Sequence, residues 1–190
     1  LAASETVRNT LASWSIAQNV WYGISLGSVL LLAAIGLAIT FGTMGVINMA
    51  HGEMVMLGAY TTFVVQQVLR SVAPNLNEFS VIIALPLAFL VSGALGVLIE
   101  RSIIRFLYGR SLDTLLATWG LSLVLQQAVR SIFGPTNREV SSPSWMSGSF
   151  KVGQLDVTYG RLWIIVFALL VFVALLGLLR RTPLGLYMRA

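Results

Sequence analysis

The sequence predicts an all-α fold, a polytopic bundle of transmembrane helices with about five spans. Composition is the first indication: 57% of the 190 residues are hydrophobic and 10% are charged, against about 25% charged in a soluble domain. A soluble domain of this size needs a polar coat that so few charges do not provide. The second indication is a series of apolar runs, because a helix needs roughly 20 apolar residues to cross the bilayer.

Five apolar runs follow one another along the chain, separated by polar and turn-forming stretches. In lipid every backbone polar group must be bonded within the protein, so each run is expected to form a helix. The second run is short for a crossing, and we expect it to extend back towards Asn48 or to be partly re-entrant. The runs are residues 20–43, 54–69, 81–99, 112–129 and 162–179.

Arginine density predicts the orientation of the helices. The formal net charge is +5, and in a membrane protein such an excess indicates cytoplasmic loops rather than a nucleic-acid partner. The start of the chain, residues 70–80 and the loop 130–161 are expected outside. Two dense clusters, after the third and fifth runs, are placed in the cytoplasm: Arg101, Arg105 and Arg110, then Arg180, Arg181 and Arg189.

Small residues predict where helices touch. Gly23 and Gly27 have GxxxG spacing, and Gly93 and Gly96 form a second small face. Close backbone approach at such faces holds helices together in lipid, where the hydrophobic drive between helices is absent. The alternative is that glycine is simply frequent in membrane helices.

Three polar side chains, Asn48, His51 and Glu53, lie with Gly52 between the first two apolar runs. An ionisable group held in lipid costs roughly 2.5–3.5 kcal/mol on insertion scales, so such groups tend to face a bundle interior or a water-filled cavity. We expect a translocation-path or gating role at membrane depth, with Asn48 accepting a backbone N–H and His51 pairing with Glu53. The alternative is a plain cytoplasmic turn in which Asn48 caps the next helix and the other two are solvated.

The fourth run carries Trp119 and Gln126 within an otherwise apolar stretch. A glutamine can hydrogen-bond between helices and a tryptophan can anchor a helix at the membrane interface, so helix packing is the default interpretation. A place in the translocation path is the second interpretation for both residues.

Absent motifs exclude several kinds of chemistry. There is no cysteine, and His51 is the only histidine, so we expect no metal site. No GxSxG motif in a strand–turn–helix setting and no Ser–His–acid pattern indicates a catalytic residue. The GxxxxGKS/T phosphate loop is missing, so the chain is not expected to bind ATP by that route. We therefore expect no cofactor.

Three short segments stand out in the first half of the chain: GLAITFG (36–42), VINMAHGEM (46–54) and LGAY (57–60). They resemble the signature of a known family, the branched-chain amino acid ABC transporter permeases. Within that family, three later segments resemble the urea-transporter permease branch: LDTLLATWG (112–120), LQQ (125–127) and IFGP (132–135). The asparagine–histidine–glycine–glutamate motif is the most specific part of the resemblance.

The resemblance implies half of the translocation pathway of an ABC importer in the inner membrane of a bacterium, with urea as the expected solute. The expected partners are a second permease subunit, two ATP-binding subunits, an extracytoplasmic solute-binding protein and the lipid bilayer, without nucleic acid. ATP hydrolysis would belong to the partner subunits, so the chain is not expected to be an enzyme. Because Leu1 is not an initiator methionine, we expect part of a longer permease.

The resemblance also divides the chain. Residues 1–18 are expected to form an extracytoplasmic N-terminal linker. Residues 19–181 are expected to be part of the transmembrane permease domain, with the extracytoplasmic loop 130–161. Residues 182–190 would begin the cytoplasmic segment that couples the permease to an ATPase. The expected coupling residues are Arg181, Pro183, Gly185 and Arg189.

Two alternatives stay open at this point. In the first, the solute is a branched-chain amino acid or another amide instead of urea, since solute selection in such importers is expected to rest largely with the binding protein. In the second, the chain is not a transporter but a membrane scaffold, or an intramembrane enzyme that uses Glu53 and His51.

Overall fold

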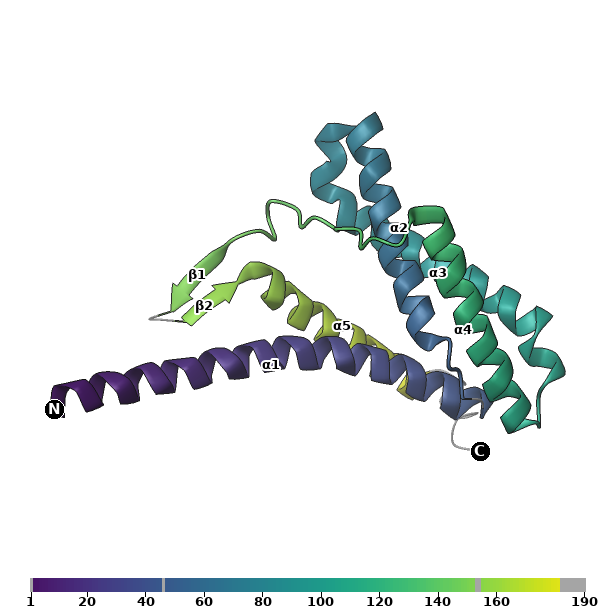
Figure 1. The fold of residues 1–190 in the computed structure, drawn as a ribbon, viewed down its shortest axis with the longest axis horizontal. Helices are drawn as coiled ribbons and strands as arrows, with labels where there is room; N and C mark the ends of the chain where they lie inside the picture. The colour runs from purple at the N-terminus through teal and green to yellow at the C-terminus, as the bar shows by residue number, and fades with distance from the viewer. Residues whose placement is uncertain (1, 46, 153–154, 182–190) are drawn as a thin grey trace. The chain divides into compact units, whose positions relative to one another are not determined.

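The computed structural model describes residues 2–45, 47–152 and 155–181. This described part contains five α-helices, which confirms the predicted all-α fold (Figure 1). Two short 3₁₀ helices and one small hairpin lie between them. In chain order the elements are α1 (Ala2–Met44), α2 (His51–Val72), η1 (Pro74–Phe79), α3 (Ser80–Ser102), η2 (Ile104–Phe106), α4 (Ser111–Phe133), β1 (Ser149–Val152), β2 (Leu155–Thr158) and α5 (Tyr159–Arg181).

Each predicted apolar run lies inside one of the α-helices, and the helices extend beyond the runs. The largest extension is in α1, which begins at Ala2 and so includes the residues expected to form a linker. The placement of those residues outside the membrane stays a prediction. The expected loop 130–161 holds the end of α4, the hairpin and the start of α5.

The hairpin of β1 and β2 was not predicted from the sequence. Its strands pair antiparallel, with Phe150 opposite Val157 and Lys151 opposite Asp156. Apolar and polar residues alternate on both strands, which is the period that a half-buried strand requires. The Lys151 ammonium lies 3.9 Å from the Asp156 carboxylate, but both side chains are exposed and such a pair adds little stability.

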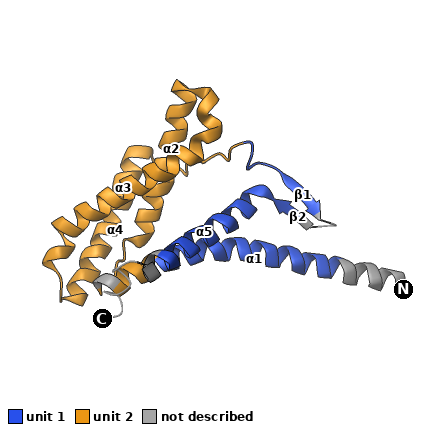
Figure 2. Cartoon of the chain, turned by 180° about the vertical axis from the view of Figure 1, so that it is seen from behind, with its two compact units in different colours: residues 1–35, 144–190 blue, residues 36–143 orange. Residues whose placement is uncertain are grey.

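The chain divides into two compact units (Figure 2). One unit contains residues 1–35 and 144–190. Within it, the Arg161 guanidinium at the start of α5 lies 4.1 Å from the centroid of the Tyr22 ring on α1, a favourable cation–π geometry. The rings of Trp145 and Trp163 pack edge-on, with centroids 5.3 Å apart.

The other unit, residues 36–143, is built on an antiparallel pair of helices, α2 and α3, joined by η1. Ser92 Oγ on α3 donates a hydrogen bond to the Met54 carbonyl oxygen on α2 at 3.2 Å. A second contact lies twelve residues further along α2, where Gln66 Nε2 lies 3.4 Å from Ser80 Oγ. Ser80 is on α3, twelve residues before Ser92, so the two helices run in opposite directions. The two contacts fix the register of the pair.

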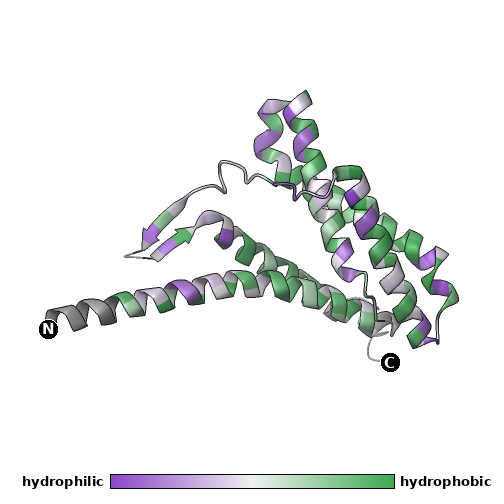
Figure 3. Cartoon of the chain, viewed as in Figure 1, coloured by the Kyte–Doolittle hydropathy of each residue, from purple (hydrophilic) through white to green (hydrophobic). Residues whose placement is uncertain are grey.

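Burial in the described residues is inverted relative to a soluble protein. Large apolar side chains are exposed, for example Phe89 at 77% and Leu112 at 75%, and Figure 3 shows apolar residues concentrated along α5 and the later part of α1. This distribution suits helices that face lipid and keep their polar groups inside the protein. The buried polar side chains are Ser25, Glu53, Gln66, Ser80, Thr114, Thr118 and Ser122.

Three helical stretches in the described residues are long and apolar enough to cross a membrane: Leu11–Gly42, Pro74–Phe106 and Tyr159–Gly177. Helices α2 and α4 have 22 and 23 residues, so length does not exclude a crossing. Both carry buried polar side chains, which lower their mean hydropathy. Membrane crossing by α2 and α4, and with it the count of five spans, stays a prediction.

Candidate functional site

The chain leaves helical geometry between α1 and α2. Gly45 has a φ of +63°, a left-handed conformation that glycine adopts without strain, and its N–H donates to the Phe41 carbonyl oxygen at 2.9 Å. Asn48 Oδ1 accepts the N–H of Ala50 at 3.0 Å. Asn48 therefore accepts a backbone N–H, as expected. Its partner Ala50 occupies the N-cap position of α2, so Asn48 supports the turn rather than the helix itself.

Thr118 on α4 is hydrogen-bonded to this non-helical segment between α1 and α2, which we call the break. Its Oγ1 accepts the N–H of Met49 at 3.2 Å and lies 3.4 Å from the Ile47 carbonyl oxygen. The Thr118 side chain is 1% exposed. Because α4 begins at Ser111, seven residues earlier, the break lies about 10 Å along that helix at 1.5 Å per residue. The break is therefore level with the interior of α4 and not with its end.

Glu53, in the first turn of α2, is bonded to the same helix. Its Oε1 accepts hydrogen bonds from Ser122 Oγ at 2.6 Å and from Gln126 Nε2 at 2.5 Å. Glu53 is 8% exposed, and bonds of this charge-assisted kind stabilise a carboxylate removed from water. The expected pairing of Glu53 with His51 is wrong, because α4 supplies both of the partners that Glu53 has among the described residues.

Helices α2 and α4 run parallel and in register. Glu53 meets Gln126 through a hydrogen bond, and Tyr60 meets Phe133 with ring centroids 4.6 Å apart. Both steps, from Glu53 to Tyr60 and from Gln126 to Phe133, are seven residues, or two helical turns. Helix α2 therefore begins beside the middle of α4.

These contacts come from a stripe of polar residues on α4, of which Thr114 bonds elsewhere, to the Leu107 and Arg110 carbonyl oxygens. Thr114, Thr118, Ser122 and Gln126 recur every four residues, so they share one face of the helix. The first three are buried. The predicted site residues include Gln126 but not Thr118 or Ser122. The spacing of four was the signal that would have found them.

A pocket of about 440 Å³ lies next to Glu53. Its walls come from α2, from α4 and from the segment that follows α4. Met56 and Val129 give it apolar surface. Among the described residues, no group of three His, Cys, Asp or Glu side chains is placed to hold a metal ion. The polar and glycine residues of the pocket wall include Gly52, Glu53, Tyr60, Gln126, Arg130 and Asn137.

The segment after α4, residues 134–143, is anchored on α2, and we call it the strap. Gln66 Nε2 donates to the Ser141 carbonyl oxygen at 2.8 Å, and the Ser141 N–H donates to Gln66 Oε1 at 3.1 Å. The Gln66 amide thus pairs with the Ser141 backbone as a neighbouring strand would. Arg70 also donates to Ser141 Oγ. Gln66 is 3% exposed, so the pairing is sheltered from water.

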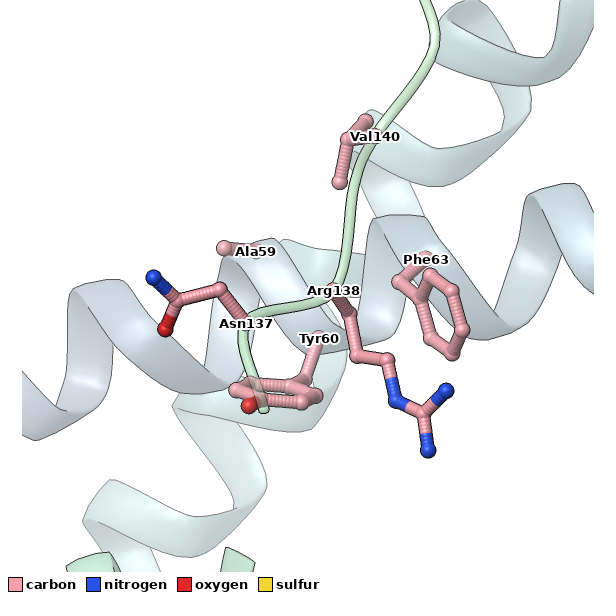
Figure 4. Close-up of a pocket in the computed structure, with 6 residues that line it drawn as sticks. All are labelled: Ala59, Tyr60, Phe63, Asn137, Arg138 and Val140. Atoms are coloured by element: carbon pink, nitrogen blue, oxygen red, sulfur yellow. The ribbon is translucent and has the colours of Figure 1, made fainter. Parts of the chain in front are cut away.

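Arg138 holds the first half of the strap. Its guanidinium donates to the Phe133 carbonyl oxygen at 2.6 Å and lies 5.9 Å from the centroid of the Phe63 ring. Figure 4 shows the strap passing over α2 at this point, with Arg138 beside Phe63. A smaller pocket of about 180 Å³ lies there, lined by Ala59, Tyr60, Phe63, Asn137, Arg138 and Val140.

Several predicted site residues lie apart from the Glu53 contacts. His51 packs against Gly36 of α1. Trp119 is 54% exposed and is not among the residues that line the pocket. A Cβ placed on any of the four packing glycines would meet no described atom outside its own helix backbone within 4 Å, so their packing role stays a prediction. These are Gly23, Gly27, Gly93 and Gly96.

The predicted coupling residues lie at or beyond the last described residue of the chain. Arg181 is the last residue of α5. The other three lie outside the described residues: Pro183, Gly185 and Arg189. Their role stays a prediction.

Comparison with known proteins gives an independent result. Residues 19–190 match the family described as branched-chain amino acid transport system, permease component. The high-affinity branched-chain amino acid transport system permease protein BraD of Pseudomonas aeruginosa is 31% identical over 179 residues. The proteins named LivH of Escherichia coli K12 and Salmonella typhimurium are each 30% identical over 181 residues. Each alignment covers 91% of this chain and 58% of the relative's length. No solved structure matches.

Proposed function

This chain belongs to the permease components of branched-chain amino acid transport systems, and we propose that it forms half of the translocation pathway of an ABC importer. It is a multi-pass membrane protein with three apolar candidate spans in its described part. The proposed partners are a second permease subunit, two ATP-binding subunits and an extracytoplasmic solute-binding protein. The proposed location is the inner membrane of a bacterium.

The observation that carries the proposal is the Glu53 carboxylate held between α2 and α4 beside a polar pocket. Its partners are Ser122 at the middle of α4 and Gln126 one turn beyond it. If α4 crosses the membrane, Glu53 lies at membrane depth, where a carboxylate is retained when it faces a polar interior or a cavity. Irregular backbone, such as the break before His51, is tolerated at that depth where it lines a cavity. The proposed path residues are Asn48, His51, Gly52, Glu53 and Gln126.

We propose urea as the solute. The support comes from the segments 112–120 and 125–127, which resemble the urea-transporter branch and lie on α4. That helix supplies the hydrogen-bonding stripe of Thr118, Ser122 and Gln126. Urea is neutral and offers both donors and acceptors, so hydrogen-bonding side chains suit it.

A branched-chain amino acid is the second candidate. The curated relatives BraD and LivH are named for the transport of these amino acids. The pocket also holds a carboxylate, Glu53, and a guanidinium, Arg130, which are complementary to the two charges of a zwitterion.

Uptake in the complete importer tests the function. Asn48→Leu, His51→Leu and Glu53→Gln are introduced singly into the full-length protein, and uptake of labelled urea and of labelled leucine is measured per molecule in the membrane. Each variant is expected to lower uptake of the transported solute. If only the membrane abundance falls, the motif is structural. If neither quantity changes, the plain-turn interpretation replaces the proposal.

The coupling role is tested separately in the full-length protein. Gly185→Trp places a large side chain in the segment proposed to dock on an ATPase. It is expected to lower solute-stimulated ATP hydrolysis without removing the subunit from the membrane. Unchanged stimulation would contradict docking at this segment.

A further inference from the structure

The pocket beside Glu53 contains a second charged group that the sequence analysis did not select. Arg130, in the last turn of α4, contributes to the pocket wall. Within the described residues its guanidinium forms no ion pair or hydrogen bond through its side chain. Arg138, five residues beyond the helix end, is by contrast bonded to Phe133 and packed near Phe63. Arg130 is therefore available to a molecule inside the pocket.

The helical spacing places Arg130 about one turn beyond Gln126, the residue that is bonded to Glu53. Gln126 is bonded directly to Glu53, and Arg130 follows it by four residues, which is about 6 Å along the helix. Glu53 and Arg130 form no salt bridge with each other. A hydrogen bond spans about 2.9 Å between heavy atoms, so a solute with donors at one end and acceptors at the other can bridge the two groups.

We propose that this pocket binds the transported solute at two ends. Glu53 Oε2 accepts from amino or amide N–H groups of the solute, since Oε1 is occupied by Ser122 and Gln126. Arg130 donates to a carbonyl or carboxylate oxygen. The inference rests on the proposed function and extends it by assigning Arg130 and the chemical class of the solute. Urea and a branched-chain amino acid both belong to this class.

The remaining wall allows either solute. Met56 and Val129 offer apolar surface that an aliphatic side chain can contact, while Asn137 of the strap adds a carboxamide. A zwitterion requires both charges. A neutral amide requires only an acceptor at residue 53, which a glutamine side chain still provides. Glu53→Gln therefore separates the two solutes.

Protection of a thiol in the pocket is the direct test. The chain has no cysteine, so Asn137→Cys in an otherwise cysteine-free complete importer gives one reporter at the pocket wall. Ser142→Cys on the exposed part of the strap is the matched control, since Ser142 does not line the pocket. Maleimide labelling of both is timed with no solute, with millimolar urea and with millimolar leucine.

We expect one solute to slow labelling at residue 137 at least about fivefold and to leave residue 142 unaffected. Arg130→Gln should remove the protection, and Arg130→Lys should restore part of it, because it keeps the charge but loses the two-pronged geometry. Gln127→Ala, a change at the exposed neighbour of Gln126, should leave it intact. With Glu53→Gln, protection by leucine should be lost and protection by urea largely kept, even where this substitution lowers uptake, because protection reports binding and not transport.

The outcomes separate this inference from the function. If the wild-type importer takes up solute but neither solute protects residue 137, the pocket is not the solute site and the transport function stands. If protection survives Arg130→Gln, the two-ended contact is wrong. If the wild-type importer transports neither solute, the proposed function fails first.

Discussion

The ring of His51 occupies the space in which a side chain at Gly36 would begin. A Cβ placed on Gly36 would lie 2.9 Å from Cε1 and 3.3 Å from Nε2 of His51. The shorter of these distances is below what real Cβ atoms show, so the ring or the α1 backbone must move if Gly36 is replaced. The absence of a side chain at Gly36 therefore lets α1 pass close to the start of α2, next to the break that carries Asn48.

Gly36→Ala is expected to destabilise the protein through this contact. Overpacking of this kind typically lowers the free energy of unfolding by about 1–3 kcal/mol. Because the crowded atoms belong to the His51 ring, His51→Ala in the same chain should recover most of the loss. A double-mutant cycle on the free energy of unfolding in detergent measures this coupling, which falls at about 0.5–3 kcal/mol for residues in contact.

Gly120→Ala is the control for this cycle. A Cβ at Gly120 on α4 meets nothing within 4 Å. This substitution should be neutral or should stabilise the helix by up to about 1 kcal/mol. Equal losses at both glycines, or a His51→Ala background that leaves the Gly36 effect unchanged, would show that the ring contact is not the cause.

Thr118→Val tests the bond between α4 and the break. Valine keeps the shape but leaves the Met49 N–H without its acceptor. Because this bond is only part-buried, the loss should lie at the lower end of the range for an unsatisfied donor, about 1 kcal/mol. Thr118→Ser keeps the hydroxyl and should lose much less. Thr61→Val is the control, since among the described residues the Thr61 hydroxyl is bonded only to the Leu57 carbonyl oxygen within its own helix. Thermal unfolding of the three purified variants should rank Thr118→Val as the least stable.

The helices were predictable because each contains a long apolar run, and such runs have no other economical structure in lipid. Composition also explains why α2 and α4 are not among the three candidate spans of the described residues: their polar residues serve contacts inside the protein. The hairpin was missed because four-residue strands give a weak signal, although Lys151 and Asp156 alternate with apolar neighbours.

The Glu53 site was predictable in part. That Asn48 would accept a backbone N–H followed from its place before a helix. The partners of Glu53 did not follow, because Ser122 and Gln126 are 69 and 73 residues away in the chain. The period of four on α4 predicts which residues share a face, but it does not tell which helix that face meets. Only the register of α2 against α4 supplies this information.

Gln66→Leu is expected to release the strap from α2. The substitution removes both hydrogen bonds to the Ser141 backbone and leaves that carbonyl and N–H without their partners. A loss of about 1.4 kcal/mol corresponds to a tenfold shift in the open population. Hydrogen exchange at Ser141 should therefore become at least about tenfold faster. The adjacent Gln67 is exposed, so Gln67→Leu should leave the exchange rate unchanged. Equal rates in the two variants would show that Gln66 does not anchor the strap.

The five-span topology is tested with single cysteines at Ser111, Ser142 and Thr182. Positive-inside reasoning places the arginines before Ser111 and those around residue 182 in the cytoplasm and the strap outside. An impermeant thiol reagent applied to intact cells should therefore label only Ser142→Cys, whereas all three should react in opened membranes.

The test also decides whether α4 crosses the bilayer, because Ser111 and Ser142 lie on either side of it. Labelling of both in intact cells would leave α4 on one side of the membrane. Glu53, which is bonded to α4, would then lie outside the hydrocarbon, and the argument for its place in the path would lose its physical basis. Labelling at Ser111 alone would invert the orientation and put the strap in the cytoplasm, where a solute-binding protein cannot reach it.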